Sequence, residues 1–308
     1  MIKEVKHKGC PMVIPEGSAF AYETPPEMLK SHQLMGVFGK RGSGKSLSCC
    51  NLIKQMGYTR SFIISPTASS NSELMKLLPI VDKSDIYTDE NDVGCLKDIE
   101  NKLDLMRDEM AEYKSNMKKY KDFINIVNNP SQSVPDDMLM LFYHNGTFNQ
   151  PEWRYGLDSN GDPKPPHCCL LCDDLQMSAI MTSRKTAQFC LRHRHHGSSE
   201  DNTPSIGISI FFLQQTYRSS NGGTPKWMRS QFTSAIFFST ANELEKKQIA
   251  LELSGEVKTQ TFLEMLEWAT KEPYGFLLWD GHKKSIHPSC FRKGFNTFLL
   301  PSDKDTEL

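Results

Sequence analysis

The sequence contains no apolar run long enough to cross a bilayer, and its charges almost cancel. Lysines and arginines number 36 and aspartates and glutamates 37, so the formal net charge is −1 at pH 7. A near-neutral chain has no global attraction for nucleic acid, so contact with DNA requires a local basic patch. The first ten residues are polar and lack the apolar core of a signal peptide. These absences predict a soluble protein of the cell interior.

The nine cysteines form an odd set, which argues against a framework of paired disulfides. Several lie inside apolar runs, where free thiols are usually buried. Cys169 and Cys172 have the C-x-x-C spacing of metal ligands, and Cys190 with the run "RHRHH" (192–196) would complete a zinc site. There is no second C-x-x-C. Burial in a parallel sheet is therefore the favoured interpretation, and zinc binding is the alternative.

A glycine-rich loop with a specific spacing is present. Residues 39–46 read "GKRGSGKS" and match G-x-x-x-x-G-K-[ST] without a mismatch. In this pattern the glycines let backbone N–H groups point at one anion, the lysine reaches the β- and γ-phosphates, and the hydroxyl binds Mg²⁺. The alternative is an ordinary turn. The residues expected to bind ATP are Gly39, Lys40, Arg41, Gly42, Ser43, Gly44, Lys45, Ser46 and Leu47, of which Lys45 is also catalytic and Ser46 also a metal ligand.

The segments around this loop favour phosphate binding over a turn. The apolar run 33–38 predicts a buried strand before the loop, and 46–56 has helical spacing and ends at Gly57. The β-rich run 61–65 follows. Strand, glycine-rich loop, helix and strand in this order are the context that the motif requires.

A second buried strand ends in two carboxylates. The run "CCLLCDD" (168–174) places five apolar residues before Asp173 and Asp174. We expect Asp173 to hold Mg²⁺ and Asp174 to act on the attacking water as base or polariser. Many ATPases use the longer glutamate at the second position. The alternative is a strand that ends in a solvated turn.

Two further polar groups accompany later strands. The apolar run 205–219 ends in Gln214 and Gln215, and we expect Gln215 to sense the γ-phosphate and orient the water. Arg229 precedes a strand at 234–239 and would reach the nucleotide of a neighbouring subunit, where it would neutralise transition-state charge. A strand cap and a surface cation are the respective alternatives.

Strands alternate with helices over 31–280, which predicts an α/β fold with a mainly parallel sheet and helices on both faces. Together with the motifs it indicates a RecA-like P-loop ATPase core. We expect a lead-in at 1–30, an ATPase domain at 31–285 with a helical insertion at about 91–137, and a tail at 286–308. The insertion carries a heptad stripe over 96–127, which predicts a long amphipathic helix packed on the body, or else a coiled-coil arm.

Two clusters of basic residues are candidates for contact with DNA phosphates. In the first, Arg184, Gln188, Arg192 and His195 are spaced to share one face of a helix. The second lies near the C-terminus and consists of Lys283, Lys284, Arg292 and Lys293. A solvated charged surface is the alternative for both.

Taken together, "GKRGSGKS", "CCLLCDD", "RHRHHG" and "FFLQQTYR…WMRSQFT" resemble the genome-packaging ATPases of large nucleocytoplasmic DNA viruses, virophages and their relatives. These form a poxvirus-type branch of the FtsK–HerA superfamily. The resemblance covers roughly residues 10–280. The paired aspartates, the Arg-His element and the strand end "QTYR" followed by an arginine before the next strand are its more specific parts.

The resemblance implies a motor that drives double-stranded DNA into a preformed capsid by Mg²⁺-dependent ATP hydrolysis. It implies a homo-oligomeric ring, a hexamer or pentamer, and partners at a capsid vertex or portal. It places the protein in the host-cell cytoplasm at sites of virus assembly and in the virion. By the same resemblance Lys45 and Ser46 bind phosphate and Mg²⁺, Asp173 holds the metal, Asp174 activates water, Gln215 is the sensor and Arg229 a finger that acts in trans.

Other P-loop functions remain alternatives. A small-molecule kinase would carry an Arg-rich lid after the core, and none is found in the sequence. A GTPase would carry N-K-x-D, and the run "NKLD" (101–104) that matches this pattern lies inside the predicted long helix. An ATPase of DNA repair or initiation would also bind DNA, and would differ from a packaging motor in needing no capsid partner.

Overall fold

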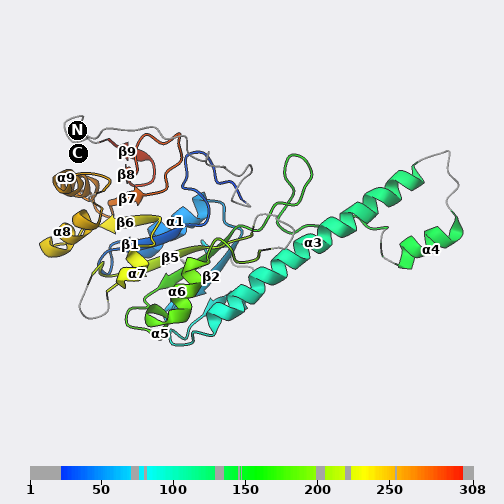
Figure 1. Cartoon of the computed structure of the whole chain (residues 1–308), viewed down its shortest axis with the longest axis horizontal. Helices are drawn as coiled ribbons and strands as arrows, with labels where there is room; N and C mark the ends of the chain where they lie inside the picture. The colour runs from blue at the N-terminus through cyan, green and yellow to red at the C-terminus, as the bar shows by residue number, and fades with distance from the viewer. Residues whose placement is uncertain are drawn as a thin grey trace, which may run out of the picture.

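A computed structural model describes residues 22–70, 76–79, 82–128, 135–144, 146, 148–198, 205–218, 223–253 and 255–300. Figure 1 shows a twisted sheet with helices on both sides and one long helix that leaves the body. No helix in these ranges is long and apolar enough to cross a membrane. The strands are β1 (Leu34–Phe38), β2 (Arg60–Ile64), β3 (Ile86–Tyr87), β4 (Cys168–Asp173), β5 (Ser209–Gln214), β6 (Ser234–Phe238), β7 (Phe276–Asp280), β8 (Phe291–Lys293) and β9 (Thr297–Leu299).

The nine strands form one sheet in the order β3-β2-β4-β5-β1-β6-β7-β8-β9. From β3 to β6 neighbouring strands are parallel, and β7, β8 and β9 are added antiparallel. β5 lies between β1, which precedes the glycine-rich loop, and β4, which ends in the paired aspartates. The mainly parallel α/β fold and the RecA-like P-loop core predicted from the sequence are confirmed.

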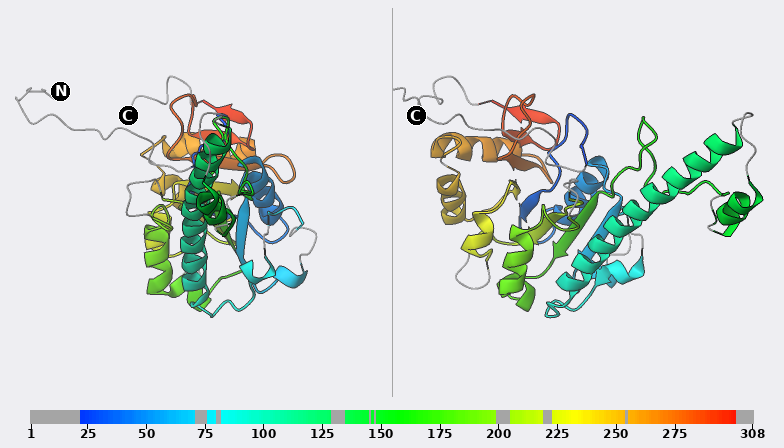
Figure 2. Two further views of the ribbon diagram at one scale, coloured as in Figure 1. Left: turned by 90° about the vertical axis from the view of Figure 1, so that its right-hand side faces the viewer. Right: turned by 45° about the vertical axis from the view of Figure 1, so that its right-hand side comes forward.

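Helices cover both faces of the sheet, as Figure 2 shows from two further directions. On one face α1 (Lys45–Gln55) packs through Leu52 and Ile53 against Val37 and its neighbours. On the other face lie α3 (Cys95–Val127), α5, α6, α8 and α9, whose apolar residues form one cluster with Phe38. The shorter helices are α4 (Asp136–His144), α5 (Ala179–Thr182), α6 (Arg184–Leu191), α7 (Lys226–Arg229), α8 (Glu243–Glu252) and α9 (Thr259–Ala269), with 3₁₀ turns η1 (Ala68–Ser70) and η2 (Lys83–Asp85).

The buried cysteines follow the alternation of β4. Cys169 faces α1 and Cys172 faces the opposite side, so the two thiols do not converge. All eight cysteines of the described ranges are free thiols, and burial raises the pKa of Cys50, Cys168 and Cys190 to about 12. Among the described residues no group of three histidine, cysteine or acidic side chains is placed to hold a metal ion. The cysteines contribute to packing rather than to chemistry.

The heptad stripe was expected to form either a helix packed on the body or an arm, and the long helix α3 has one part of each kind. Its first half buries Leu96, Ile99 and Leu103 against the sheet, whereas Met110 and Met117 farther along are only half-buried. Figure 1 shows the second half extending beyond the body, with α4 beside its far end. Aromatic rings of α3 and α4 are in contact there: Phe142 of α4 lies edge-on to Phe123 of α3, with ring centroids 5.0 Å apart. The helix is therefore packed at its base and an arm at its tip.

The C-terminal boundary differs from the expected tail at 286–308. β8 and β9 lie within that range and extend the sheet beyond β7. Phe291 is 1% exposed and belongs to the core cluster that includes α9. The antiparallel additions were missed because strands of three residues have too few positions to show an alternating pattern. Residues 301–308 and 1–21 lie outside the described residues.

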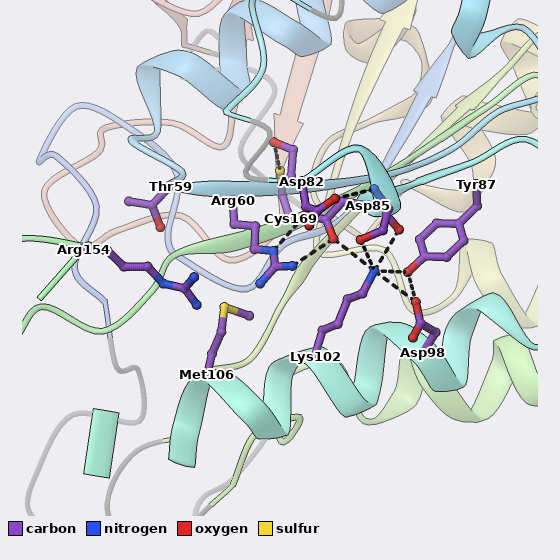
Figure 3. A network of polar contacts seen from close by, with 12 residues as sticks. Thr59, Arg60, Asp82, Asp85, Tyr87, Asp98, Lys102, Met106, Arg154 and Cys169 are labelled. Carbon is purple, nitrogen blue, oxygen red and sulfur yellow. Dashed lines mark hydrogen bonds and ion pairs between the residues drawn. The ribbon is translucent and has the colours of Figure 1, made fainter. Parts of the chain in front are cut away.

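A buried charge network fixes the base of α3 to the sheet edge (Figure 3). Asp85 is fully buried and accepts two hydrogen bonds from Arg60 of β2, both 2.9 Å long. Lys102 of α3 donates to the same carboxylate over 3.2 Å and to the Tyr87 hydroxyl over 3.0 Å. The Tyr87 hydroxyl in turn donates to Asp98 on α3. The network joins β2, β3 and the base of α3 into one unit.

Removing Asp85 should therefore be costly. Asp85→Ala leaves the Arg60 guanidinium buried without its partner, and we expect a loss of about 3–5 kcal/mol in the free energy of unfolding. Urea denaturation measures this loss. The matched control is Asp108→Ala, because the Asp108 side chain is 64% exposed in its pair with Arg107 and should contribute less than about 1 kcal/mol. Equal losses in the two variants would contradict the role of the network.

Buried histidines make the fold sensitive to acid. The His167 ring is stacked between Tyr22 and Tyr58, with centroid distances of 4.0 and 3.9 Å. Burial lowers the pKa of His167 to about 3 and that of His32 to about 4. A lowered pKa in the folded state means that the unfolded chain takes up protons first, so stability is lost as the pH falls from about 6.5 toward these values.

We expect the free energy of unfolding to fall by roughly 2 kcal/mol for each such histidine between pH 7 and pH 5. His167→Phe keeps a ring between the two tyrosines and removes the titrating group, so its stability should fall less steeply over the same interval. Urea denaturation at several pH values checks this. Identical slopes for wild type and His167→Phe would show that His167 does not contribute.

Candidate active site

The glycine-rich loop joins β1 to α1 and folds as the motif requires. Gly44 has φ +96°, a left-handed conformation that other residues rarely adopt, and it immediately precedes the helix. A Cβ on Gly39 would lie 2.6 Å from the Ser43 hydroxyl and 2.8 Å from Cβ of Phe238. The first turn of α1 has neither a side-chain cap nor an acidic residue. Its N–H groups and positive dipole end are therefore suited to a bound anion.

Lys45 and Ser46 turn toward the loop and toward β4. The Lys45 ammonium donates to the Gly39 carbonyl over 2.7 Å and to the Lys40 carbonyl over 3.2 Å. Burial lowers the pKa of Lys45, and the charges of Asp173 and Asp174 oppose that shift. The Ser46 hydroxyl donates to Asp173 over 3.0 Å. These contacts bring the two sequence motifs, 127 residues apart, to one place.

The two aspartates occupy different environments. Asp173, the last residue of β4, is 8% exposed, and burial, followed by the charge of Asp174, raises its pKa. Asp174 is exposed and has φ +55°, so the chain turns sharply after the strand. The Thr67 hydroxyl, from the loop after β2, donates to Asp174 over 3.4 Å. The Asp173 carboxylate thus lies on the inner wall of the site, and the Asp174 carboxylate lies on its open side.

Of the two glutamines after β5, Gln215 lies at the site. Gln214 is fully buried, and its amide points toward the sulfur of Met181 at 3.8 Å. Gln215 is exposed and lines the same pocket as the aspartates. A backbone hydrogen bond holds the end of β5 beside the glycine-rich loop, because the Gly39 N–H donates to the Gln214 carbonyl over 3.2 Å.

Lys45, Ser46, Asp173, Asp174 and Gln215 line a pocket of about 550 Å³ at the carboxyl ends of the parallel strands. Thr67, Gln176 and Tyr274 also line it and were not predicted from the sequence. Polar residues after β2, in the run "PTASS", could have indicated Thr67, because carboxyl ends of parallel strands meet at one edge. The lining residues are Arg41, Gly42, Gly44, Lys45, Ser46, Leu47, Thr67, Asp173, Asp174, Gln176, Gln215 and Tyr274. Lys40 and Ser43 line an adjoining pocket.

Arg229 lies apart from this pocket. Its guanidinium donates to Glu252 over 3.0 Å and to the Thr224 carbonyl over 2.5 Å, and it lies over the Tyr217 ring. Arg229, Glu252 and Tyr217 line a different pocket, also of about 550 Å³, which includes Arg218. Within one copy of the chain, Arg229 is thus a structural ion-pair partner and does not line the pocket at the glycine-rich loop.

The oxygen atoms of Ser46 and Asp173 suit a magnesium ion. Mg²⁺ prefers hydroxyl, carboxylate and water oxygens, and it is commonly bound through one or two protein groups together with substrate phosphates. The hydroxyl and the carboxylate lie beside Lys45 at the start of α1. The donor set fits the metal predicted from the sequence.

Comparisons with known proteins give structural neighbours only. No family model and no curated protein matches the chain. Among solved structures, the genome-packaging NTPase B204 of Sulfolobus turreted icosahedral virus 2 in complex with ATPγS matches with 14% identity and a TM-score of 0.39, over 81% of this chain and 92% of that chain. The AMP complex of the same protein gives 13% identity and a TM-score of 0.42, with the same coverage.

A second neighbour is the pCW3 conjugation coupling protein TcpA in its monomer form with ATPγS. It matches with 15% identity and a TM-score of 0.36 over 89% of this chain, which spans 62% of that chain.

Proposed function

We propose that this chain is an ATPase that translocates double-stranded DNA and packages a viral genome into a preformed capsid. The observation that carries the proposal is the convergence of Lys45, Ser46, Asp173, Asp174 and Gln215 on one pocket, with the sensor strand β5 between the two motif strands. The sequence motifs that resemble the packaging ATPases of large DNA viruses supply the rest. A homo-oligomeric ring and a capsid vertex or portal as partner belong to the same proposal.

Five residues of the pocket have roles in hydrolysis by this proposal. The start of α1 and the Lys45 ammonium bind the phosphates of ATP, and Ser46 and Asp173 would hold Mg²⁺, which supplies charge neutralisation at the phosphates when bound. Asp174, on the open side, accepts a proton from the attacking water or orients it. Gln215 positions the same water. The preorganised cation and N–H groups stabilise charge that develops on the transferred phosphoryl group.

Arg229 has a role only if a second copy of the chain supplies it. In the ring, Arg229 of one copy would leave Glu252 and enter the nucleotide site of the next copy, where it would neutralise transition-state charge. By this proposal the pocket that contains Arg229 and the exposed Arg218 faces that neighbour.

The contacts of the two basic clusters favour the first as the DNA contact. Lys284 donates to the Thr24 and Pro25 carbonyls, and Arg292 is 2% exposed, so the C-terminal cluster is engaged within the chain. Arg184 and Arg192, in contrast, are exposed at the two ends of α6. α6 ends at Leu191, so His195 follows in a turn and does not share the helical face predicted for it.

The test is steady-state ATP hydrolysis with and without long linear duplex DNA. We expect several-fold stimulation by DNA that weakens as salt is raised. Arg184→Ala combined with Arg192→Ala should lose most of the stimulation and keep basal hydrolysis. The control removes the same charge elsewhere, by Lys54→Ala with Lys97→Ala, and should keep both. Hydrolysis indifferent to DNA would contradict the translocase, and phosphate transfer to another acceptor would indicate a kinase.

A further inference from the structure

Tyr274 marks the boundary between two pockets at the phosphate loop. The pocket of about 550 Å³ contains the predicted phosphate-binding groups, and the adjoining pocket has about 390 Å³. Gly42 and Tyr274 line both. The second pocket is otherwise formed by the loop residues Lys40 and Ser43, by the end of β6 and by residues 270–275. Tyr274 therefore stands where a ligand would pass from one to the other.

The backbone at Tyr274 is strained and its side chain is exposed. Tyr274 has φ +62°, which is a genuine outlier for a bulky side chain, and it is 71% exposed. Burial of the ring therefore does not compensate for the strain. Its Cδ1 lies only 3.2 Å from the position that a Cβ on Gly44 would take, so the ring lies against the phosphate loop. Uncompensated strain of this kind collects at ligand sites.

The sheet order decides which part of a nucleotide would meet Tyr274. β5 and β4 lie on one side of β1 and carry Gln215 and Asp173, which fix the phosphate end there. β6 and β7 lie on the other side of β1, and Tyr274 lies two residues before the start of β7. A nucleotide with its terminal phosphates beside Asp173 has its nucleoside end free to extend toward Tyr274.

We propose that the Tyr274 ring stacks on the nucleobase of a bound nucleoside triphosphate and that the adjoining pocket holds the nucleoside end. This inference rests on the proposed function of the phosphate pocket. Stacking uses the π-face that every base has, so it distinguishes a nucleotide from bare polyphosphate and selects little among bases. Tyr274 is thus a binding residue for the base and takes no part in the chemistry at the phosphates.

The experiment compares the binding of ATP and of inorganic tripolyphosphate, both with Mg²⁺, by titration calorimetry. Tyr274→Ala should weaken ATP binding by roughly 5- to 150-fold and leave tripolyphosphate binding unchanged. The control Tyr274→Phe keeps the ring and should bind both as the wild type does. Equal ATP affinity in Tyr274→Ala and wild type would overturn the stacking role, and so would an equal loss for both ligands, which would indicate a role in loop shape.

The proposed function and this inference fail in different ways. A wild-type chain that binds neither ATP nor tripolyphosphate would overturn the phosphate site and the stacking role with it, whereas the outcomes above overturn stacking alone. Tyr274→Gly provides a second readout, because glycine adopts positive φ without strain. We expect a higher midpoint of thermal unfolding together with weaker ATP binding. A lower midpoint would show that Tyr274 serves the fold and would contradict the proposal.

Discussion

Replacing Lys45 by alanine is expected to reduce the rate of ATP hydrolysis at least 100-fold, to roughly the background of the assay. The Lys45 ammonium is the cation buried at the start of α1, 2.7 Å from the Gly39 carbonyl and within the pocket that contains both aspartates. Alanine there removes the charge that would contact the β- and γ-phosphates. Release of phosphate from ATP under steady-state conditions measures the effect.

Lys54→Ala is the matched control for this prediction. Lys54 is exposed in the last turn of α1, so the variant removes one lysine from the same helix without touching the pocket. Its rate should equal that of the wild type. Circular dichroism and thermal unfolding should show that both variants are folded. Hydrolysis by Lys45→Ala within a few-fold of the wild-type rate would mean that the glycine-rich loop is not the phosphate site.

Asp174→Asn is expected to lower kcat by about 10²- to 10⁴-fold while ATP still binds. The amide has the shape of the carboxylate, and its oxygen can still accept the hydrogen bond from Thr67. What is lost is the negative charge that would take a proton from water or orient it. Calorimetric titration with ATP and single-turnover hydrolysis separate binding from chemistry.

The contrast with Asp173 sharpens this prediction. Asp173 contacts Ser46 on the metal side, so Asp173→Asn should reduce the dependence of binding on Mg²⁺, which Asp174→Asn should leave intact. Asp108→Asn, on the surface of α3, changes the net charge equally and should change neither property. Full activity in Asp174→Asn would exclude Asp174 as the base and transfer the task of orienting water to Gln215.

The parts of the fold predicted from the sequence are those whose signal is local. β1, the loop and α1 are contiguous, so one motif specifies strand, turn and helix start together. β4 and β5 were predictable because each is an apolar run that ends abruptly in polar residues. Parallel strands place such ends at one edge, which is why Asp173 and Gln215 were predicted beside Lys45 although they are distant in sequence.

Other features depend on contacts that no short segment reveals. Tyr274 reaches the phosphate loop because β7 runs antiparallel beside β6, a pairing that the sequence pattern does not indicate. Its place in a basic cluster of the sequence predicts Arg292 to be a surface cation, yet it is buried and donates to the Glu27 carbonyl. α4 has no counterpart among the expectations, because a helix of nine residues is too short to show a clear helical period in the sequence.

The strained residues connect the fold with the proposed chemistry. Four residues other than glycine have positive φ in the described part of the chain, and two of them, Asp174 and Tyr274, line the pocket that contains Lys45. A third, Met177, follows Asp174 closely and is 73% exposed. Strain that persists beside a pocket is typical of a site whose geometry is maintained for a ligand.

Displacement of a third DNA strand from a duplex tests translocation most directly. A labelled oligonucleotide is bound as a triplex at one end of a long linear duplex, and its release is followed with the chain and ATP present. We predict ATP-dependent release that is delayed as the duplex before the triplex is lengthened, and no release with Lys45→Ala or with a non-hydrolysable analogue. DNA-stimulated ATP hydrolysis without release of the third strand would contradict a translocating motor.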